Sequence, residues 1–130
     1  INFIRDIAED FTLNRQYLPT TELKRFGLTN LSQGEALKKP KEFQDFMRAQ
    51  IAQYTQWQHQ AAQGYKYIPY RYRVPICTAA QMYAWTARCI AKDPLIVYQK
   101  KVKPSKYLVI AIGLWTCFTQ LPIVRMFSSN

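Results

Sequence analysis

The sequence predicts an all-α protein, and three observations carry this prediction. Apolar residues between positions 40 and 64 recur at steps of three and four, the spacing of one helix face. The segment 65–74, rich in aromatic and basic residues, is too short and too interrupted by Pro69 for a strand. No internal repeat or Gly/Ser linker occurs, so residues 1–130 are expected to form one all-α unit. The apolar stripe consists of Phe43, Phe46, Met47, Ile51, Tyr54, Trp57 and Ala61.

The first half of the chain is punctuated by helix start and stop signals. Residues 1 to about 10 fit the end of a helix, which Leu18-Pro19 terminates. Thr20 or Thr21 can cap a short helix that ends at Gly27. Residues 28–39 are predicted to be a polar connection. A long helix then starts at about residue 40 and ends near residue 64.

Two further helices are expected in the second half. The first runs from about Pro75 to Lys92, where Asp93-Pro94 stops it. The second starts at Pro104 or Ser105 and runs to about Gln120. It lies in the uncharged run 107–124, whose eighteen residues are at the short limit for a spanning helix of about 20 residues. Polar residues within the run favour a helix with one face on a bilayer, and a membrane anchor is the alternative.

Charge is distributed unevenly along the chain. The formal net charge is +10. After Phe46, Asp93 is the sole acidic residue, against eleven lysines and arginines. This asymmetry indicates an anionic partner such as a diphosphate, an acidic membrane surface or a nucleic acid. No nucleic-acid-binding motif accompanies the basic residues, so nucleic acid is not expected. Three cysteines without metal-site spacing indicate thiols in a reducing cytosol.

The densest acidic cluster lies at the start of the chain. Asp6 and Asp10 are four residues apart, which places both carboxylates on one helix face. Asn2 sits one turn earlier, with Arg5 and Glu9 beside that face. Oxygen donors at this spacing suit a hard cation such as Mg²⁺, which bridges to substrate phosphates. The alternative is an exposed acidic helix end, which the helix dipole disfavours.

The motif N-x-x-R-D-x-x-E-D, followed by R-x-Y-x-P, resembles the second aspartate-rich motif of the squalene/phytoene synthase family. The matching residues are Asn2, Arg5, Asp6, Glu9, Asp10, Arg15, Tyr17 and Pro19. The resemblance continues in Arg73-Val-Pro75, Ala79-Ala80 and Met82-Tyr83, and in Lys101-Val102 with Ser105-Lys106. Lys101 departs from the pattern, because the family usually has arginine there. Lysine keeps the charge but loses the bidentate grip on phosphate.

The resemblance implies an isoprenoid-synthase-type helical bundle, of which this chain would be the C-terminal half. Its first aspartate-rich motif is absent from residues 1–130, so the fragment alone is expected to be inactive. The implied reaction is head-to-head condensation of two prenyl diphosphates through Mg²⁺-assisted ionisation and a cyclopropyl intermediate. Geranylgeranyl diphosphate giving phytoene is preferred. Squalene or dehydrosqualene formation from farnesyl diphosphate is the alternative, with NADPH needed only for squalene. A non-catalytic assembly factor of the same family is a third possibility.

The resemblance also assigns roles to individual residues. Asn2, Asp6, Glu9 and Asp10 would hold Mg²⁺ or Mn²⁺, and Asp6, Asp10 and Arg5 would be catalytic. Arg5, Arg15, Tyr17, Tyr83 and Lys101 would bind the substrate. Salt bridging for the arginines and core packing for the tyrosines are the alternatives. A cytoplasmic protein peripherally associated with the membrane is expected, and the oligomeric state is left open.

Overall fold

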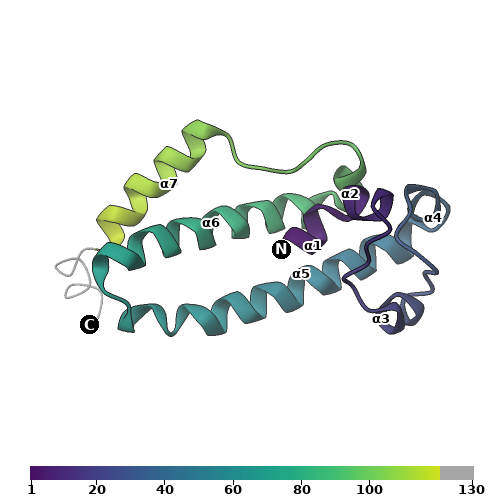
Figure 1. The fold of residues 1–130 in the computed structure, drawn as a ribbon, viewed down its shortest axis with the longest axis horizontal. Helices are drawn as coiled ribbons and strands as arrows, with labels where there is room; N and C mark the ends of the chain where they lie inside the picture. Colours follow the sequence, from purple (N-terminus) through teal and green to yellow (C-terminus); the bar gives the residue numbers. More distant parts are fainter. Residues whose placement is uncertain (121–130) are drawn as a thin grey trace. The chain divides into compact units, whose positions relative to one another are not determined.

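A computed structural model of the chain describes residues 1–120 (Figure 1). The described residues contain α-helices, 3₁₀ turns and loops, and no strand, which confirms the all-α prediction. The chain divides into two compact units. The first comprises Ile1–Thr55 and Thr86–Lys103. The second comprises Gln56–Trp85 and, within the described residues, positions 104–120.

Four short helices open the first unit: α1 (Asn2–Arg5), α2 (Ile7–Thr12), α3 (Thr20–Arg25) and α4 (Gln33–Lys38). The expected helix over residues 1–10 is therefore present, but it is interrupted at Asp6. The predicted end of α3 at Gly27 is confirmed. Gly27 has a φ of 75°, and the bonds Gly27 N–H to Lys24 O and Leu28 N–H to Leu23 O close a Schellman turn.

Helix α4 lies where a polar connection was predicted, and that prediction is wrong. Ala36 is the one buried residue of α4, so the sequence contains no apolar stripe from which this helix could be predicted. Its start is fixed by Ser32, whose hydroxyl accepts a hydrogen bond from the Glu35 N–H at 3.1 Å. The Glu35 carboxylate in turn accepts from the Thr29 N–H and hydroxyl, both at 3.1 Å. These capping hydrogen bonds, and not burial of an apolar face, therefore stabilise this helix.

The core of the first unit is built around the N-terminal part of α5 (Pro40–Ala62). Phe43, Phe46 and Met47 are fully buried, as the apolar stripe predicts. The Phe46 ring meets the Phe26 ring edge to face at 5.7 Å. Phe43 packs at 5.5 Å against Tyr98, the last residue of η2 (Pro94–Tyr98). This 3₁₀ turn follows the predicted helix stop at Asp93-Pro94 and keeps the chain packed against the core.

The second unit contains η1 (Tyr65–Tyr67), the N-terminal part of α6 (Tyr70–Lys92) and α7 (Lys106–Thr119). Helix α6 starts at Tyr70 rather than near Pro75, so this proline lies inside the helix. Pro75 has no N–H to donate to the Arg71 carbonyl, and all five residues from Tyr70 to Val74 are nevertheless helical. Thr116 of α7 is buried and accepts a hydrogen bond from Gln81 of α6 at 2.9 Å.

The opposite face of α7 is apolar and exposed. Its residues are Tyr107, Ile110, Leu114, Trp115 and Phe118. The predicted last helix is thus confirmed within the described residues, whereas positions 121–124 of the uncharged run lie outside them. Among residues 1–120, no helix is both long enough and apolar enough to cross a membrane.

Candidate functional site

The acidic segment keeps its one-turn spacing in spite of the interruption between α1 and α2. The Asp6 N–H donates to the Asn2 carbonyl at 2.8 Å, and the Asp10 N–H donates to the Asp6 carbonyl at 2.8 Å. Asn2, Asp6 and Asp10 therefore follow one another at successive turns, as their spacing predicts. Asn2 and Glu9 are exposed, whereas Asp6 and Asp10 are partly buried.

Arg5 holds the Asp6 carboxylate with both ends of its guanidinium. Nε donates to Oδ1 at 2.8 Å, and Nη2 donates to Oδ2 at 2.6 Å. Both side chains are more than four-fifths buried, so solvent screens this pair little. The hydrogen bonds from Arg5, supported by the charge of Lys101, hold the pKa of Asp6 below its ordinary value of 3.8.

Lys101 joins this cluster from the far end of the unit. Its Nζ lies 2.9 Å from Glu9 Oε2 and 3.5 Å from Asp6 Oδ1. The hydrogen bond with Glu9, followed by the Asp6 charge, raises the pKa of Lys101. An open pocket with about 220 Å³ of free space lies here, between α2 and the segment that follows η2. Arg5, Asp6, Glu9, Lys100 and Lys101 are among its lining residues.

Tyr98 positions the segment that carries Lys101, a role that the sequence did not reveal. Its hydroxyl donates to the Leu31 carbonyl at 2.9 Å, and its ring packs on Phe43. Burial raises the pKa of Tyr98, so the hydroxyl stays protonated and remains a donor. Helix α2 also contacts η2 directly. The available signal was an apolar run, residues 95–98, placed just before the basic residues.

Asp10 and Arg15 are brought together by a tight turn at the end of α2. Asn14 has a φ of 53°, a conformation that asparagine tolerates better than most residues. The Asn14 N–H donates to Phe11 O at 3.1 Å, and the Arg15 N–H donates to Asp10 O at 2.8 Å. These two bonds form a second Schellman turn. The sequence N-terminal to Tyr17 is thereby folded back beside the acidic helix.

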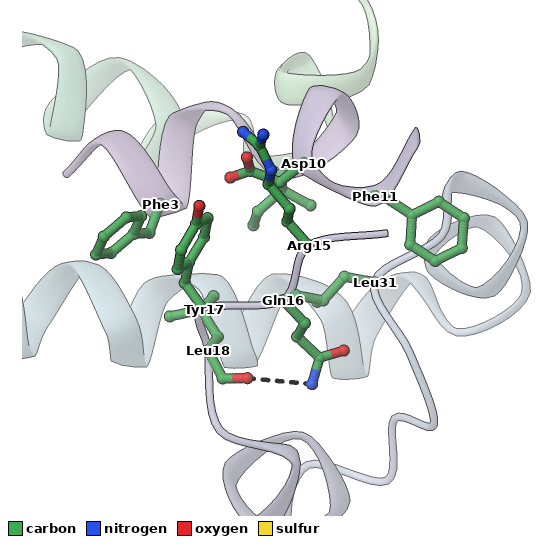
Figure 2. A pocket seen from close by; sticks show the side chains of 9 residues that line it. Phe3, Asp10, Phe11, Arg15, Gln16, Tyr17, Leu18 and Leu31 are labelled. Atoms are coloured by element: carbon green, nitrogen blue, oxygen red, sulfur yellow. Dashed lines mark hydrogen bonds between the residues drawn. The ribbon is translucent and has the colours of Figure 1, made fainter. Parts of the chain in front are cut away.

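A second pocket lies at this turn (Figure 2). Asp10, Arg15 and Tyr17 line it, and Figure 2 shows the Tyr17 hydroxyl directed toward the side where Asp10 and Arg15 lie. The Tyr17 ring stacks on Phe3 at 4.3 Å and is half exposed. Tyr17 thus combines packing with an available hydroxyl. Asp6 and Asp10 line different pockets, so the acidic segment presents carboxylates to two hollows.

The donor chemistry of the segment fits a hard divalent cation. Among residues 1–120, no three acidic, histidine or cysteine side chains are grouped as a complete metal site. Mg²⁺ does not need such a group, because it commonly uses one or two carboxylates with water and phosphate oxygens. Asp6 and Asp10 supply carboxylates, and no ion pair is recorded for Asp10 within the described part of the chain. The residues therefore fit as a partial site that substrate and water complete.

Tyr83 belongs to the second unit, where it lies on α6 and is 39% exposed. The predicted site residues that the first unit brings together are therefore the acidic segment, Arg5, Arg15, Tyr17 and Lys101.

The Asp6 pair predicts a pH dependence of stability. A carboxylate whose pKa falls on folding stabilises the folded state above its unfolded pKa, here 3.8, and this contribution is lost as the pH falls through the folded value. We expect the wild type to lose more unfolding free energy than Asp6→Asn between about pH 6 and about pH 3. Urea unfolding at several pH values measures this difference. Parallel curves for the two proteins would contradict the assignment.

Comparison with protein families gives a match to the family model described as squalene/phytoene synthase. The match covers residues 1–107, which include the residues that line the two pockets described above. Comparisons with curated proteins and with solved structures give no significant match.

Proposed function

Since this chain belongs to the squalene/phytoene synthase family, whose enzymes are prenyltransferases that join two prenyl diphosphates head to head, we propose that it serves the formation of phytoene from two geranylgeranyl diphosphates. The proposal is supported mainly by one observation: a single pocket is lined by Arg5, Asp6, Glu9 and Lys101. Carboxylates for a cation and basic groups for phosphate oxygens are the two donor sets that a diphosphate–metal complex requires.

In the proposed site, Asp6 and Asp10 hold Mg²⁺, or alternatively Mn²⁺, with support from Asn2 and Glu9. When bound, the metal supplies neutralising charge to the departing diphosphate and fixes its position. The bidentate contact with Arg5 orients the Asp6 carboxylate before the substrate arrives. This preorganisation lowers the cost of binding the charged leaving group.

The basic and aromatic residues act on the substrate. Arg5, Arg15 and Lys101 bind phosphate oxygens as the C–O bond of the first substrate breaks and its electron pair leaves with the diphosphate. The double bond of the second substrate then attacks the allylic cation, and loss of a proton to the released diphosphate closes the ring of the cyclopropyl intermediate. This intermediate ionises by losing the second diphosphate and rearranges, and loss of another proton gives the product. Tyr17 and Tyr83 contact the substrate. Positioning and exclusion of water therefore carry most of the catalysis.

The decisive experiment is a product assay on the full-length protein with Mg²⁺. Phytoene from geranylgeranyl diphosphate is expected, with little turnover of farnesyl diphosphate, and chelation of the metal should abolish it. Squalene or dehydrosqualene from farnesyl diphosphate would replace the proposed product, and a requirement for NADPH would identify squalene formation. Failure to convert either substrate, together with a degraded first aspartate-rich motif in the upstream coding sequence, would favour the non-catalytic alternative.

We further propose that the protein is cytoplasmic and binds the membrane surface peripherally. The exposed face of α7 is apolar, and Lys106 opens this helix. An apolar helix face with a lysine at its start matches a bilayer with anionic headgroups, because the face enters the interface while the lysine remains at the phosphates. Such a location brings the site to its lipid-soluble substrates and product.

Leu114 is 68% exposed on this face, and we expect Leu114→Glu to lower binding to phosphatidylglycerol-containing vesicles by at least about tenfold. Co-sedimentation of the full-length protein measures the effect. The matched control is Gln63→Glu, which introduces the same charge at an exposed position outside α7. Equal binding by Leu114→Glu and the wild type would rule out α7 as the docking face.

High salt or carbonate should release the protein from membranes, and resistance to both would favour a spanning anchor.

A further inference from the structure

Lys101 already occupies part of the acidic face in the absence of any metal. Its ammonium group lies 2.9 Å from Glu9 and 3.5 Å from Asp6. Ninety-two positions separate Lys101 from Glu9 in the chain, so packing of the unit, not local sequence, creates this contact. An ammonium group between two carboxylates makes the same kind of contact that a bound cation would make.

We infer that Lys101 is an exchangeable internal counter-ion of this site. At rest it neutralises Glu9 and Asp6, and it releases them when a divalent cation binds and a diphosphate oxygen becomes available to Lys101. The inference rests on the proposed function, because it assumes that the acidic segment binds the metal. It adds a regulatory role to Lys101: metal binding and diphosphate binding become coupled through one side chain.

The two basic residues of the cluster, Arg5 and Lys101, differ in how tightly their carboxylate partners hold them. Arg5 is held bidentately to Asp6, and its side chain is 18% exposed, so it is a fixed partner. The Lys101 side chain is 50% exposed and the Glu9 side chain 60% exposed. An exposed pair of this kind is weak and screened by salt. Arg5 therefore stays in place while Lys101 can leave.

The chemistry of lysine suits this role better than that of arginine. Lysine carries a compact charge on a flexible four-carbon stem, whereas the planar guanidinium of arginine favours a fixed fork on one carboxylate. At this position, where the family pattern has arginine, lysine loses bidentate phosphate binding. Lysine can move from a carboxylate to a phosphate oxygen without breaking a bidentate contact.

The inference predicts that removing the Lys101 charge strengthens metal binding in the absence of substrate. Titration of Mg²⁺ alone into the full-length protein, followed by calorimetry, should give a dissociation constant roughly three- to tenfold lower for Lys101→Met than for the wild type. Raising the salt concentration should narrow this difference, because the displaced pair is exposed. Lys101→Arg keeps a positive charge at this position, so it should not bind Mg²⁺ more tightly than the wild type.

Lys103→Met is the matched control. Lys103 is an exposed neighbour of Lys101, does not line the pocket, and has no ion pair recorded among residues 1–120. The substitution removes one positive charge from the same segment, and its Mg²⁺ dissociation constant should stay within about twofold of the wild-type value. An equal gain in Mg²⁺ affinity for Lys101→Met and Lys103→Met would assign the effect to the general electrostatic field and overturn the inference.

The failure of this inference and the failure of the proposed function give different results. If the wild type binds Mg²⁺ and Lys101→Met binds it equally or more weakly, Lys101 is not a competing counter-ion, and the metal site stands. If neither the wild type nor any variant binds Mg²⁺ alone or with inorganic pyrophosphate, the proposed metal site is wrong and the inference falls with it.

Discussion

Replacing Asp6 or Asp10 by asparagine in the full-length protein is expected to lower turnover of geranylgeranyl diphosphate by about a thousandfold or more. Each substitution keeps the size of the side chain and removes the negative charge that would hold the cation against the leaving diphosphate. The proposed site uses both carboxylates to hold the cation, so neither is expected to compensate for the other. Steady-state rates at saturating Mg²⁺ measure the loss.

The matched control for this prediction is Asp45→Asn. Asp45 is half exposed and lies 3.9 Å from Arg48 on α5, away from both pockets. Its substitution should leave the rate within about twofold of the wild type. Circular dichroism and urea unfolding should be recorded for each variant, since Asp6→Asn also removes the partner of Arg5. Unchanged rates for both site variants would remove the metal assignment.

The largest expected effect on stability comes from Phe43→Ala. Phe43 is fully buried on α5 and packs on Tyr98. Truncation of a buried phenylalanine costs about 3–5 kcal/mol of unfolding free energy, through lost burial and the cavity left behind. Because Tyr98 precedes the segment that carries Lys101, the cavity should also loosen the basic side of the site. The urea midpoint at constant m-value measures the loss.

Trp57→Ala provides a control on the same helix. Trp57 is 60% exposed although it belongs to the apolar stripe predicted from the sequence. Its truncation is expected to change the unfolding free energy by no more than about 0.5 kcal/mol. A similar loss for both variants would mean that the stripe is buried along its whole length, contrary to the structure.

Periodicity and stop signals in the sequence were sufficient for the long helices. The stripe that starts at Phe43 predicted α5, and Gly27 predicted the end of α3. The predicted start of α7 at Pro104 or Ser105 is also close, because Ser105 is its N-cap. These features are local, because a helix face and a cap depend on residues three or four positions apart. The capping pair Ser32 and Glu35 was also visible, but without an apolar stripe α4 was not recognised.

Other elements depended on contacts that no local pattern records. The 3₁₀ turn η2 follows a proline stop signal, and the burial of Val97 and Tyr98 against the rest of the unit keeps it in place. The start of α6 at Tyr70 was missed because Pro75 suggested a first turn rather than an interior position. For η2, tertiary packing outweighed the local signal. For α6, local bonds from the Tyr72 and Arg73 N–H groups to the Pro69 carbonyl already start the helix before Pro75.

The sequence by itself determined the family resemblance, the helical class and the one-turn spacing of Asn2, Asp6 and Asp10. Tertiary structure alone decided which groups meet these carboxylates. The turn at Asn14 places Arg15 beside Asp10. Burial of η2 fixes the segment after it, so that the Lys101 ammonium group contacts the Glu9 carboxylate. The physical reason is range: helix geometry fixes neighbours within one turn, whereas a contact across ninety-two positions exists only once the core has packed.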